Sequence, residues 1–157
     1  MGAPSPAPET ATPLVTPAPP SPPRPGPYLG STDGCRPAFW ARARNFDLWE
    51  EHQPAQSVGE FFPEPEEYAG LRLVDALRRT AGEDDARREL LREAVAGILN
   101  GAHESLGYPY SRYEAGLDGR PPLVPTVAEL LRSGTDEQVE AFRRDLAAAN
   151  RLGCPLR

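Results

Sequence analysis

The chain has 157 residues, a formal net charge of −6 at pH 7, and 39% hydrophobic and 25% charged residues, which fits one small globular domain. The acidic balance disfavours a nucleic-acid partner, because binding phosphates needs a basic face, and no apolar run reaches the roughly 18 residues that indicate a membrane span. All 17 basic residues are arginine, so Schiff-base catalysis and P-loop phosphate binding, which use lysine, are excluded.

Residues 1–34 are predicted to form an extended or disordered proline-rich arm, a spacer in front of the folded domain. Of the 20 prolines, 11 lie within the first 27 residues, and proline favours an extended polyproline II conformation. The stretch Pro19–Arg24 fits the PxxPxR pattern that SH3 domains bind, although a chance match is expected in so proline-rich a tract. The arm lacks the basic n-region and apolar h-region of a signal peptide.

From Cys35 onward the spacing of apolar residues is helical, and no segment alternates like a strand. The first helix is predicted to begin near Pro37, which suits a first helical turn, and to have one apolar face formed by Phe39, Ala43, Phe46 and Trp49. Residues 53–70, which include three prolines, are predicted to be mostly loop, with Phe61 and Phe62 against the core.

A short helix is predicted at residues 71–80 and a long one at about 84–103, with Asp84 and Asp85 stabilising its N-terminus. The long helix has a continuous apolar stripe, formed by Leu90, Leu91, Ala94, Val95, Ile98, Leu99 and Ala102. Its other face is predicted to be exposed to solvent and consists of Arg87, Arg88, Glu89, Arg92 and Glu93.

A loop rich in tyrosine, glycine and proline follows at residues 104–125. Two capping boxes, Thr126–Glu129 and Thr135–Gln138, are predicted to open the last two helices, and Gly153 is predicted to end the second of them. Together these elements predict an all-α fold, a compact bundle of about five helices with long ordered loops over residues 35–157.

The only two cysteines, Cys35 and Cys154, lie at the two ends of this predicted domain. Neither has a second cysteine or a histidine at metal-ligand spacing, and there is no CxxC redox motif. We therefore predict a disulfide between them, with two independent thiols as the alternative. Because disulfides persist in oxidising compartments, an extracellular or cell-surface location is expected, with a signal peptide removed or replaced.

Four parts of the chain carry a recognisable pattern: Gly34–Trp40, Phe46–Trp49, Glu93–His103 with Gly107–Tyr110, and Ala149–Leu156. Together they resemble a module of exported bacterial and archaeal proteins that begins C-T-P-G-[FY]-W, carries an A-V-A-x-L-L-N-A-A-H helix and ends N-x-x-G-C-P-L. This chain departs from the pattern near the tryptophan, where it has Ala38 and Ala41. The resemblance implies an extracellular, disulfide-closed helical module, often attached to other surface domains, and it implies no activity.

The candidate binding residues have aromatic or guanidinium side chains, which dominate recognition hot spots. They are Tyr108, Tyr110, Arg112 and Tyr113 in loop 105–125, together with Trp40 and Trp49. Tyrosine and tryptophan rings can also stack on sugars, so a glycan is a further candidate ligand. The alternative is that Tyr108 and Tyr110 only pack the loop onto the bundle.

No set of residues predicts catalysis or metal binding, and we predict no catalytic residue, no metal and no cofactor. His103 ends the long helix, where a histidine is favourable to the helix dipole, and His52 is predicted to lie on the surface. Glu64, Glu66 and Glu67 form an acidic segment without the fixed glycine of an EF-hand. A solvated turn is predicted there, with a weak cation site as the alternative.

These observations predict a non-enzymatic extracellular module with a structural or adhesive role, for example a subunit of a surface assembly or filament. Its partners would be other proteins or further copies of itself at the cell surface. The alternative is a glycan- or peptide-binding domain that uses the tyrosine-rich loop 105–125. A hydrolase is a third and weaker interpretation, because an enzyme needs polar groups that converge on a cleft.

Overall fold

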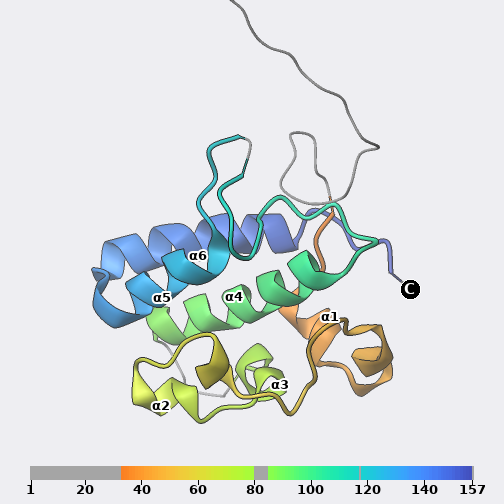
Figure 1. Ribbon diagram of the computed structural model, residues 1–157, viewed down its shortest axis with the longest axis horizontal. Coiled ribbons are helices and arrows are strands. Elements are labelled where there is room, and N and C mark those ends of the chain that lie inside the picture. Colours follow the sequence, from red (N-terminus) through yellow and green to blue (C-terminus); the bar gives the residue numbers. More distant parts are fainter. Residues whose placement is uncertain (1–32, 80–84, 117, 157) are drawn as a thin grey trace, which may run out of the picture.

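The computed structural model describes residues 33–79, 85–116 and 118–156 (Figure 1). Its helices are α1 (Pro37–Ala41), α2 (Glu66–Ala69), α3 (Leu73–Leu77), α4 (Ala86–Ala102), α5 (Leu123–Ser133) and α6 (Asp136–Asn150), with 3₁₀-helices at Ala43–Leu48 and Val58–Glu60. No strand occurs in these ranges, so the predicted all-α class is confirmed. Almost all of the predicted proline-rich arm lies outside the described residues.

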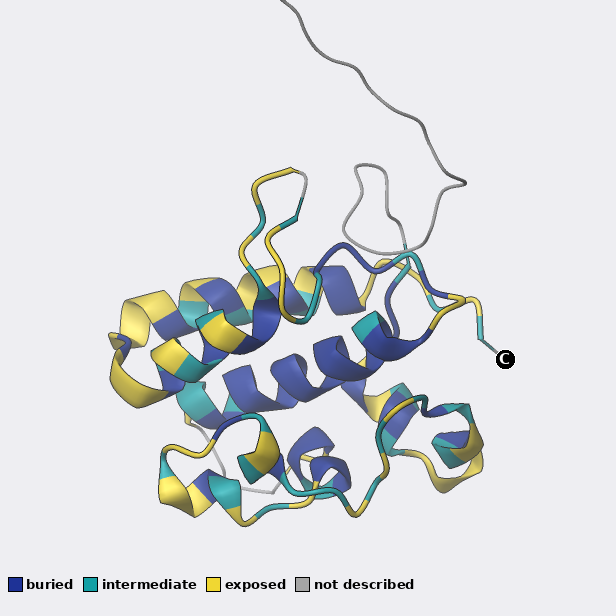
Figure 2. Cartoon of the chain, viewed as in Figure 1, coloured by how far each residue is buried: buried dark blue, intermediate teal, exposed yellow. Residues whose placement is uncertain are grey.

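Helix α4 lies at the centre of the molecule. Figure 1 shows it between α5 and α6 on one side and α1 and α3 on the other, and all four of these helices contact it. Figure 2 shows buried residues along most of its length, and Leu90, Leu91 and Ile98 have no exposed surface. A helix that is covered on several sides needs apolar residues around its circumference, and the unbroken apolar run of residues 94–99 provides them.

The predicted solvent-exposed face of this helix is wrong for three residues. Arg88, Arg92 and Glu93 are only 5%, 9% and 1% exposed, whereas Arg87 and Glu89 are intermediate. The prediction assumed that one side of the helix faces water. Helices α3 and α6 instead pack against α4 from both sides, so these charged side chains reach partners inside the protein.

Helix α5 begins four residues earlier than predicted, and the predicted Thr126 capping box does not form. Pro122 is the N-cap residue and Leu123 is the first helical residue. The backbone N–H groups of the first two helical residues donate to the carbonyls of residues 111 and 112, and Pro125 in the first turn has no N–H group to satisfy. The tyrosine-rich loop therefore caps this helix in place of a local side chain.

Helix α6 begins with the predicted capping box. The backbone N–H of Gln138 donates to the Thr135 hydroxyl at 3.1 Å, and the backbone N–H of Thr135 donates to the Gln138 side-chain oxygen at 3.0 Å. The side chain of Asp85 caps α4 in a similar way, accepting from the N–H of Arg87 at 3.1 Å. The two longest helices thus have the local caps that the sequence predicts.

The part of the chain before α4 is more finely divided than predicted. Helix α1 starts at Pro37 as expected but ends at Ala41, and a 3₁₀-helix follows it. The region predicted as loop, residues 53–70, includes α2 and the second 3₁₀-helix, with Phe62 fully buried in the core and Phe61 partly buried against it. Within the described ranges, no helix has both the length and the apolarity needed to cross a bilayer.

Candidate functional site

The predicted disulfide between Cys35 and Cys154 is present and joins residues 119 positions apart. Next to it, Gly34 and Gly153 form an antiparallel backbone bridge, in which the N–H of Gly34 donates to the carbonyl of Gly153 at 2.9 Å. A Cβ atom at Gly34 would lie 1.9 Å from the carbonyl oxygen of Ala149. The start of the domain is therefore fastened to the end of α6 by a covalent bond and by close backbone contact.

A buried asparagine connects this disulfide to the middle of the fold. Asn100 has no exposed surface. Its side-chain oxygen accepts from the N–H of Cys35 at 2.9 Å and from the indole N–H of Trp40 at 3.1 Å. Its amide group donates to the carbonyl of Cys35 and to the side-chain oxygen of Asn150, both at 2.9 Å. Every donor and acceptor of this amide is thus satisfied inside the protein.

Asn150, at the end of α6, extends the network. Its side-chain oxygen accepts from the Tyr108 hydroxyl at 2.6 Å. Its amide group donates to the carbonyl and to the carboxylate of Glu93, at 3.0 Å and 2.8 Å. Trp49 joins through its indole N–H, which donates to the carbonyl of Trp40 at 3.1 Å. All four parts of the sequence that carry the recognisable pattern therefore meet in one buried hydrogen-bond network.

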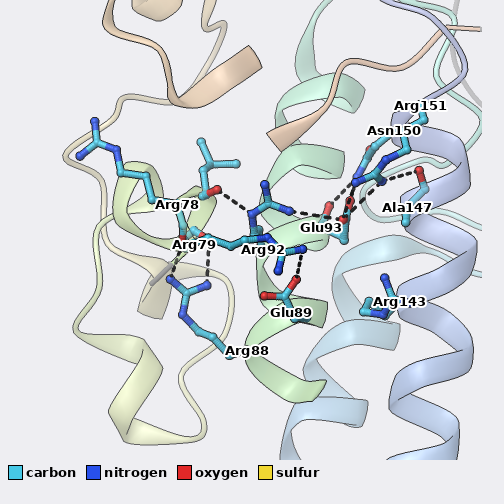
Figure 3. Close-up of polar contacts among 12 residues, drawn as sticks. Arg78, Arg79, Arg88, Glu89, Arg92, Glu93, Arg143, Ala147, Asn150 and Arg151 are labelled. Atoms are coloured by element: carbon cyan, nitrogen blue, oxygen red, sulfur yellow. Dashed lines mark hydrogen bonds and ion pairs between the residues drawn. The ribbon is translucent and has the colours of Figure 1, made fainter. Parts of the chain in front are cut away.

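Two buried arginines of α4 hold the end of α3 (Figure 3). The Arg88 guanidinium donates to the carbonyls of Ala76 and Asp75 at 2.8 Å and 2.9 Å, and to the carbonyl of Arg78 at 3.2 Å. The Nε of Arg92 donates to the carbonyl of Leu77 at 3.0 Å, and burial lowers the pKa of Arg92. The last carbonyls of a helix have no partner within that helix, so these side chains act as caps supplied by a neighbouring helix.

Glu93 is the buried carboxylate of the same cluster. Its Oε2 lies 3.6 Å from Nη1 of Arg92 and 3.5 Å from Nη1 of Arg151, while its Oε1 accepts from Asn150. Figure 3 shows that these partners come from α4 and from the end of α6. A carboxylate between two guanidinium groups resembles a reactive site, but here both of its oxygens are engaged by the protein, and the arrangement joins α6 to α4.

Only one of the three tyrosines in the candidate binding loop is exposed. Tyr108 is fully buried and Tyr110 is 6% exposed, whereas Tyr113 is 55% exposed. The ring of Tyr110 meets Phe142 edge-on at 5.8 Å, and the Arg120 guanidinium lies 5.5 Å from its centroid. Burial raises the pKa of Tyr108 and of Tyr110. Their positions match the packing alternative, and their ring faces are not open to a ligand.

Trp40 and Trp49 also lie in the core. They are 0% and 9% exposed, and the indole N–H of each is used inside the protein, by Asn100 and by the Trp40 carbonyl respectively. The aromatic ring of Phe39 covers Trp40 edge-on at 5.3 Å. Neither tryptophan presents a surface to a ligand. Both instead pack α1 and the residues after it against the core.

Arg112 and Tyr113 are the candidate residues that remain nearest to solvent. Arg112 forms a two-point ion pair with Glu51, at 2.9 Å and 3.2 Å, and lies 5.7 Å over the ring of Tyr113. Its Nη1 is 3.2 Å from Nε2 of His52, which is half-buried rather than exposed as predicted. Burial and, to a smaller extent, Arg112 lower the pKa of His52. This cluster fastens the base of the segment between α4 and α5, residues 104–122, which we call the tyrosine loop.

His103 ends α4 as predicted and is 7% exposed. Its Nε2 lies 3.5 Å from the Glu50 carboxylate, and its Nδ1 accepts from the N–H of Ser105 at 3.2 Å. The neighbouring Glu104 is not its partner, because the backbone N–H of Glu104 donates to Glu50 instead. Both ring nitrogens therefore face groups that position the start of the tyrosine loop.

The tyrosine loop connects α4 to α5 along the chain and projects from the side of the body that α5 and α6 form (Figure 1). A backbone hydrogen bond from the N–H of Gly116 to the carbonyl of Arg120, at 2.8 Å, joins the two sides of the loop near its tip. A hollow of about 470 Å³ lies beside it. We call this hollow the loop groove and define it by the lining residues Tyr110, Asp118, Arg120, Pro121, Asp145 and Leu152.

The loop groove combines an exposed apolar side chain with an unpaired carboxylate. Asp118 forms an ion pair with Arg120 at 3.1 Å, but Asp145 has no ion pair with any other residue that the structure describes. Leu152 is 48% exposed and, with Tyr113, is one of the two exposed large hydrophobic residues in the described ranges. The groove is therefore acidic overall and suits a ligand with apolar groups and a positive charge.

A second hollow, of about 340 Å³, lies beside the disulfide and has the opposite charge. Its lining includes Phe39 and the three arginines Arg36, Arg42 and Arg151. Arg151 also contacts Glu93, and its Nη1 donates to the carbonyl of Ala147. No polar side chain points to a particular ligand here, so this hollow is described without a role.

The acidic segment of residues 64–67 runs into a short helix. Glu66 and Glu67 occupy the first turn of α2, after Pro65. In the part of the chain that the structure describes, no three His, Cys, Asp or Glu side chains are grouped so that they could hold a metal ion.

No protein-family model, curated protein or solved structure matches this chain. The function is therefore proposed from the fold and from the surfaces of the molecule.

Proposed function

We propose that this chain is a non-enzymatic extracellular module with a structural or adhesive role, a subunit that contacts further copies of itself or other proteins at the cell surface. The observation that carries the proposal is that the proline-rich arm and the tyrosine loop leave the domain at neighbouring positions. The N–H of Asp33 donates to the carbonyl of Gly107 at 3.1 Å, and the N–H of Gly107 donates to the Asp33 carboxylate at 2.8 Å. The disulfide fixes the same region to α6.

The buried polar side chains support a structural role. Arg88 and Arg92 bind backbone carbonyls of α3, Glu93 binds Asn150, and His103 contacts Glu50. Groups used in this way hold elements together, whereas catalysis needs polar groups that converge on an accessible cleft. The disulfide supports an oxidising compartment, where such bonds persist.

Light scattering of the oxidised full chain, compared with a chain that lacks residues 2–33, tests the proposal. We expect the mass of the full chain to rise with concentration toward an oligomer. The shortened chain should stay monomeric and keep its helical far-UV circular dichroism, because the helices of the described ranges all begin at or after Pro37. A full chain that stays monomeric at high concentration would contradict self-assembly.

A peptide- or glycan-binding domain is the second candidate function, and the loop groove favours it. The exposed Leu152 and Asp145, which has no ion pair within the described ranges, suit an extended basic peptide. Stacking on a sugar would depend on Tyr113, since Phe142 and Arg120 cover the ring of Tyr110. Saturable binding of basic peptides by a monomeric chain, lost in Asp145→Asn, would favour this candidate over self-assembly.

A further inference from the structure

We propose that the loop groove binds the proline-rich arm of a second copy of this chain, with Arg24 of that arm beside Asp145. The inference rests on the self-assembly proposed for this module. It adds the receiving surface, the arm segment and the charged pair that make the contact.

The walls of the loop groove have the chemistry that binds a proline-rich segment. Such segments are already extended as polyproline II helices, so little conformational entropy is lost when they dock in grooves with aromatic and apolar walls. Pro121 and the exposed Leu152 supply apolar walls, and Tyr110 lies beneath them with its ring covered by Phe142 and Arg120. The segment of residues 17–27 is the matching ligand in the same chain, because seven of its eleven residues are proline.

Charge indicates which residue of that segment would lie beside Asp145. Arg24 is the only basic residue among the first 34, and Asp145 is an exposed carboxylate on the groove wall without an ion pair in the described part of the chain. The neighbouring Asp118 is already paired with Arg120. An arginine next to a proline-rich stretch and a carboxylate at the edge of a groove form a strong, directional pair, which fixes where the arm stops along the groove.

The arm joins the domain at Asp33 and Gly34, which we call the arm's root, and this root lies beside the loop groove. Asp33 and Gly34 lie against Gly107 and Gly153, and Gly153 is adjacent to Leu152 of the groove. Arg24 precedes Asp33 by nine residues, a stretch that can span at most about 30 Å. The proposed self-assembly requires a contact between copies, and an arm that enters the groove of a second copy supplies one. Two copies that meet with these ends can exchange arms reciprocally, as a symmetric contact requires.

Charge-reversal variants of the oxidised full chain test the pairing, with sedimentation velocity as the measurement. Arg24→Glu and Asp145→Arg should each weaken self-association about tenfold or more, because a favourable pair becomes a repulsive one. Combining both changes in one chain should restore association. An equimolar mixture of the two single variants should also associate, since one copy supplies an intact arm and the other an intact groove.

The matched control is Glu137→Arg, which makes the same charge change on the exposed first turn of α6 and should associate like the wild type. Circular dichroism of every variant should show an unchanged fold. If Arg24→Glu and Asp145→Arg associate as strongly as the wild type, the pairing is overturned while the proposed self-assembly stands. Rescue by the double variant but not by the mixture would assign each arm to its own groove and overturn the second-copy source. A wild-type chain that never associates overturns both proposals.

Discussion

Asn100 and Asn150 stabilise this fold through amide groups that donate and accept at the same time. Both have no exposed surface, and together they contact the disulfide segment, the first helix, α4 and the tyrosine loop. Neither a carboxylate nor an apolar side chain could supply both halves of this pattern. Asn100 and Asn150 thus join, by hydrogen bonds, parts of the recognisable pattern that lie far apart along the chain.

Asn100→Ala is expected to lower the free energy of unfolding by about 3 kcal/mol or more. The N–H and carbonyl of Cys35 and the indole N–H of Trp40 lose their partner, and each buried unsatisfied group costs about 1–3 kcal/mol. Urea denaturation measures the change. Gln53→Ala, which removes an amide on the exposed surface, should change stability by less than about 0.5 kcal/mol. Equal effects of the two substitutions would mean that the network contributes little.

Buried tyrosines predict a loss of stability at alkaline pH. Burial, followed by the Asp85 carboxylate, raises the pKa of Tyr68, and burial raises the pKa of Tyr108 and Tyr110. In the unfolded chain these phenols ionise near pH 10, whereas the folded chain retains their protons. Above about pH 10 the unfolded state therefore binds fewer protons, and stability falls as pH rises, while below that pH these groups have no effect.

Ultraviolet absorbance of phenolate, followed together with circular dichroism, checks this expectation. The phenolate signal of the three buried tyrosines should appear only as helix is lost. Tyr108→Phe removes one of these phenols, but it also removes the hydrogen bond to Asn150, so Tyr110→Phe is the better variant for shifting the alkaline transition to higher pH. Complete ionisation near pH 10 in a chain that is still folded would contradict the argument.

At the scale of elements, the sequence predicts the position of α4 correctly, but it does not predict which charged residues of this helix are buried. The apolar spacing predicts its position to within two residues, because that signal is local. The burial of Arg88 and Glu93 is not local, since their partners lie on α3 and α6. The unbroken apolar run of residues 94–99 is the one sign in the sequence that more than one face of this helix is covered.

For the candidate binding residues, too, the sequence does not predict which side chains are buried by distant parts of the chain. Tyrosine content marks loop 105–125 as unusual, but composition does not distinguish Tyr108, whose hydroxyl reaches Asn150 in the core, from the exposed Tyr113. The groove wall residue Asp145 was not among the candidates, because it lies on a helix far along the chain from the loop that it faces. Only the packing of α6 beside the loop brings Asp145 and Tyr110 to one groove.

The two threonines of the predicted capping boxes allow a matched test, because one of them caps its helix and the other does not. Thr135→Ala is expected to cost about 1 kcal/mol, within the range for loss of an N-cap, because its hydroxyl accepts from the N–H of Gln138. Thr126→Ala should cost less than about 0.5 kcal/mol, since Thr126 lies inside α5, whose first N–H groups bind loop carbonyls. Thermal denaturation of both variants gives the comparison. A larger loss at Thr126 would indicate that α5 starts where the sequence motif places it.

At the scale of the whole molecule, the disulfide determines how the ends of the domain are arranged. It holds the first residues of the domain on the last turn of α6, next to the Gly34–Gly153 bridge. The arm's root, the tyrosine loop and the loop groove consequently share one end of the bundle.

Replacing both Cys35 and Cys154 by serine should therefore lower stability without abolishing the fold. The chain-entropy model gives about 4.7 kcal/mol for a closed loop of roughly 100 residues, and a loss of about 3–5 kcal/mol is expected here for a separation of 119 residues. The backbone of Cys35 keeps both hydrogen bonds to Asn100, so the helical far-UV spectrum should remain at low temperature.

Reductant separates the bond itself from other effects of the substitution. Wild-type protein in excess reductant should unfold at the same urea concentration as the double serine variant, and the variant should not respond to reductant. Alkylation of the denatured, unreduced wild type should label no thiol, because the structure contains no free cysteine. Two labelled thiols would contradict the disulfide and remove the main support for an extracellular location, since the other features of the fold are equally compatible with a reducing compartment.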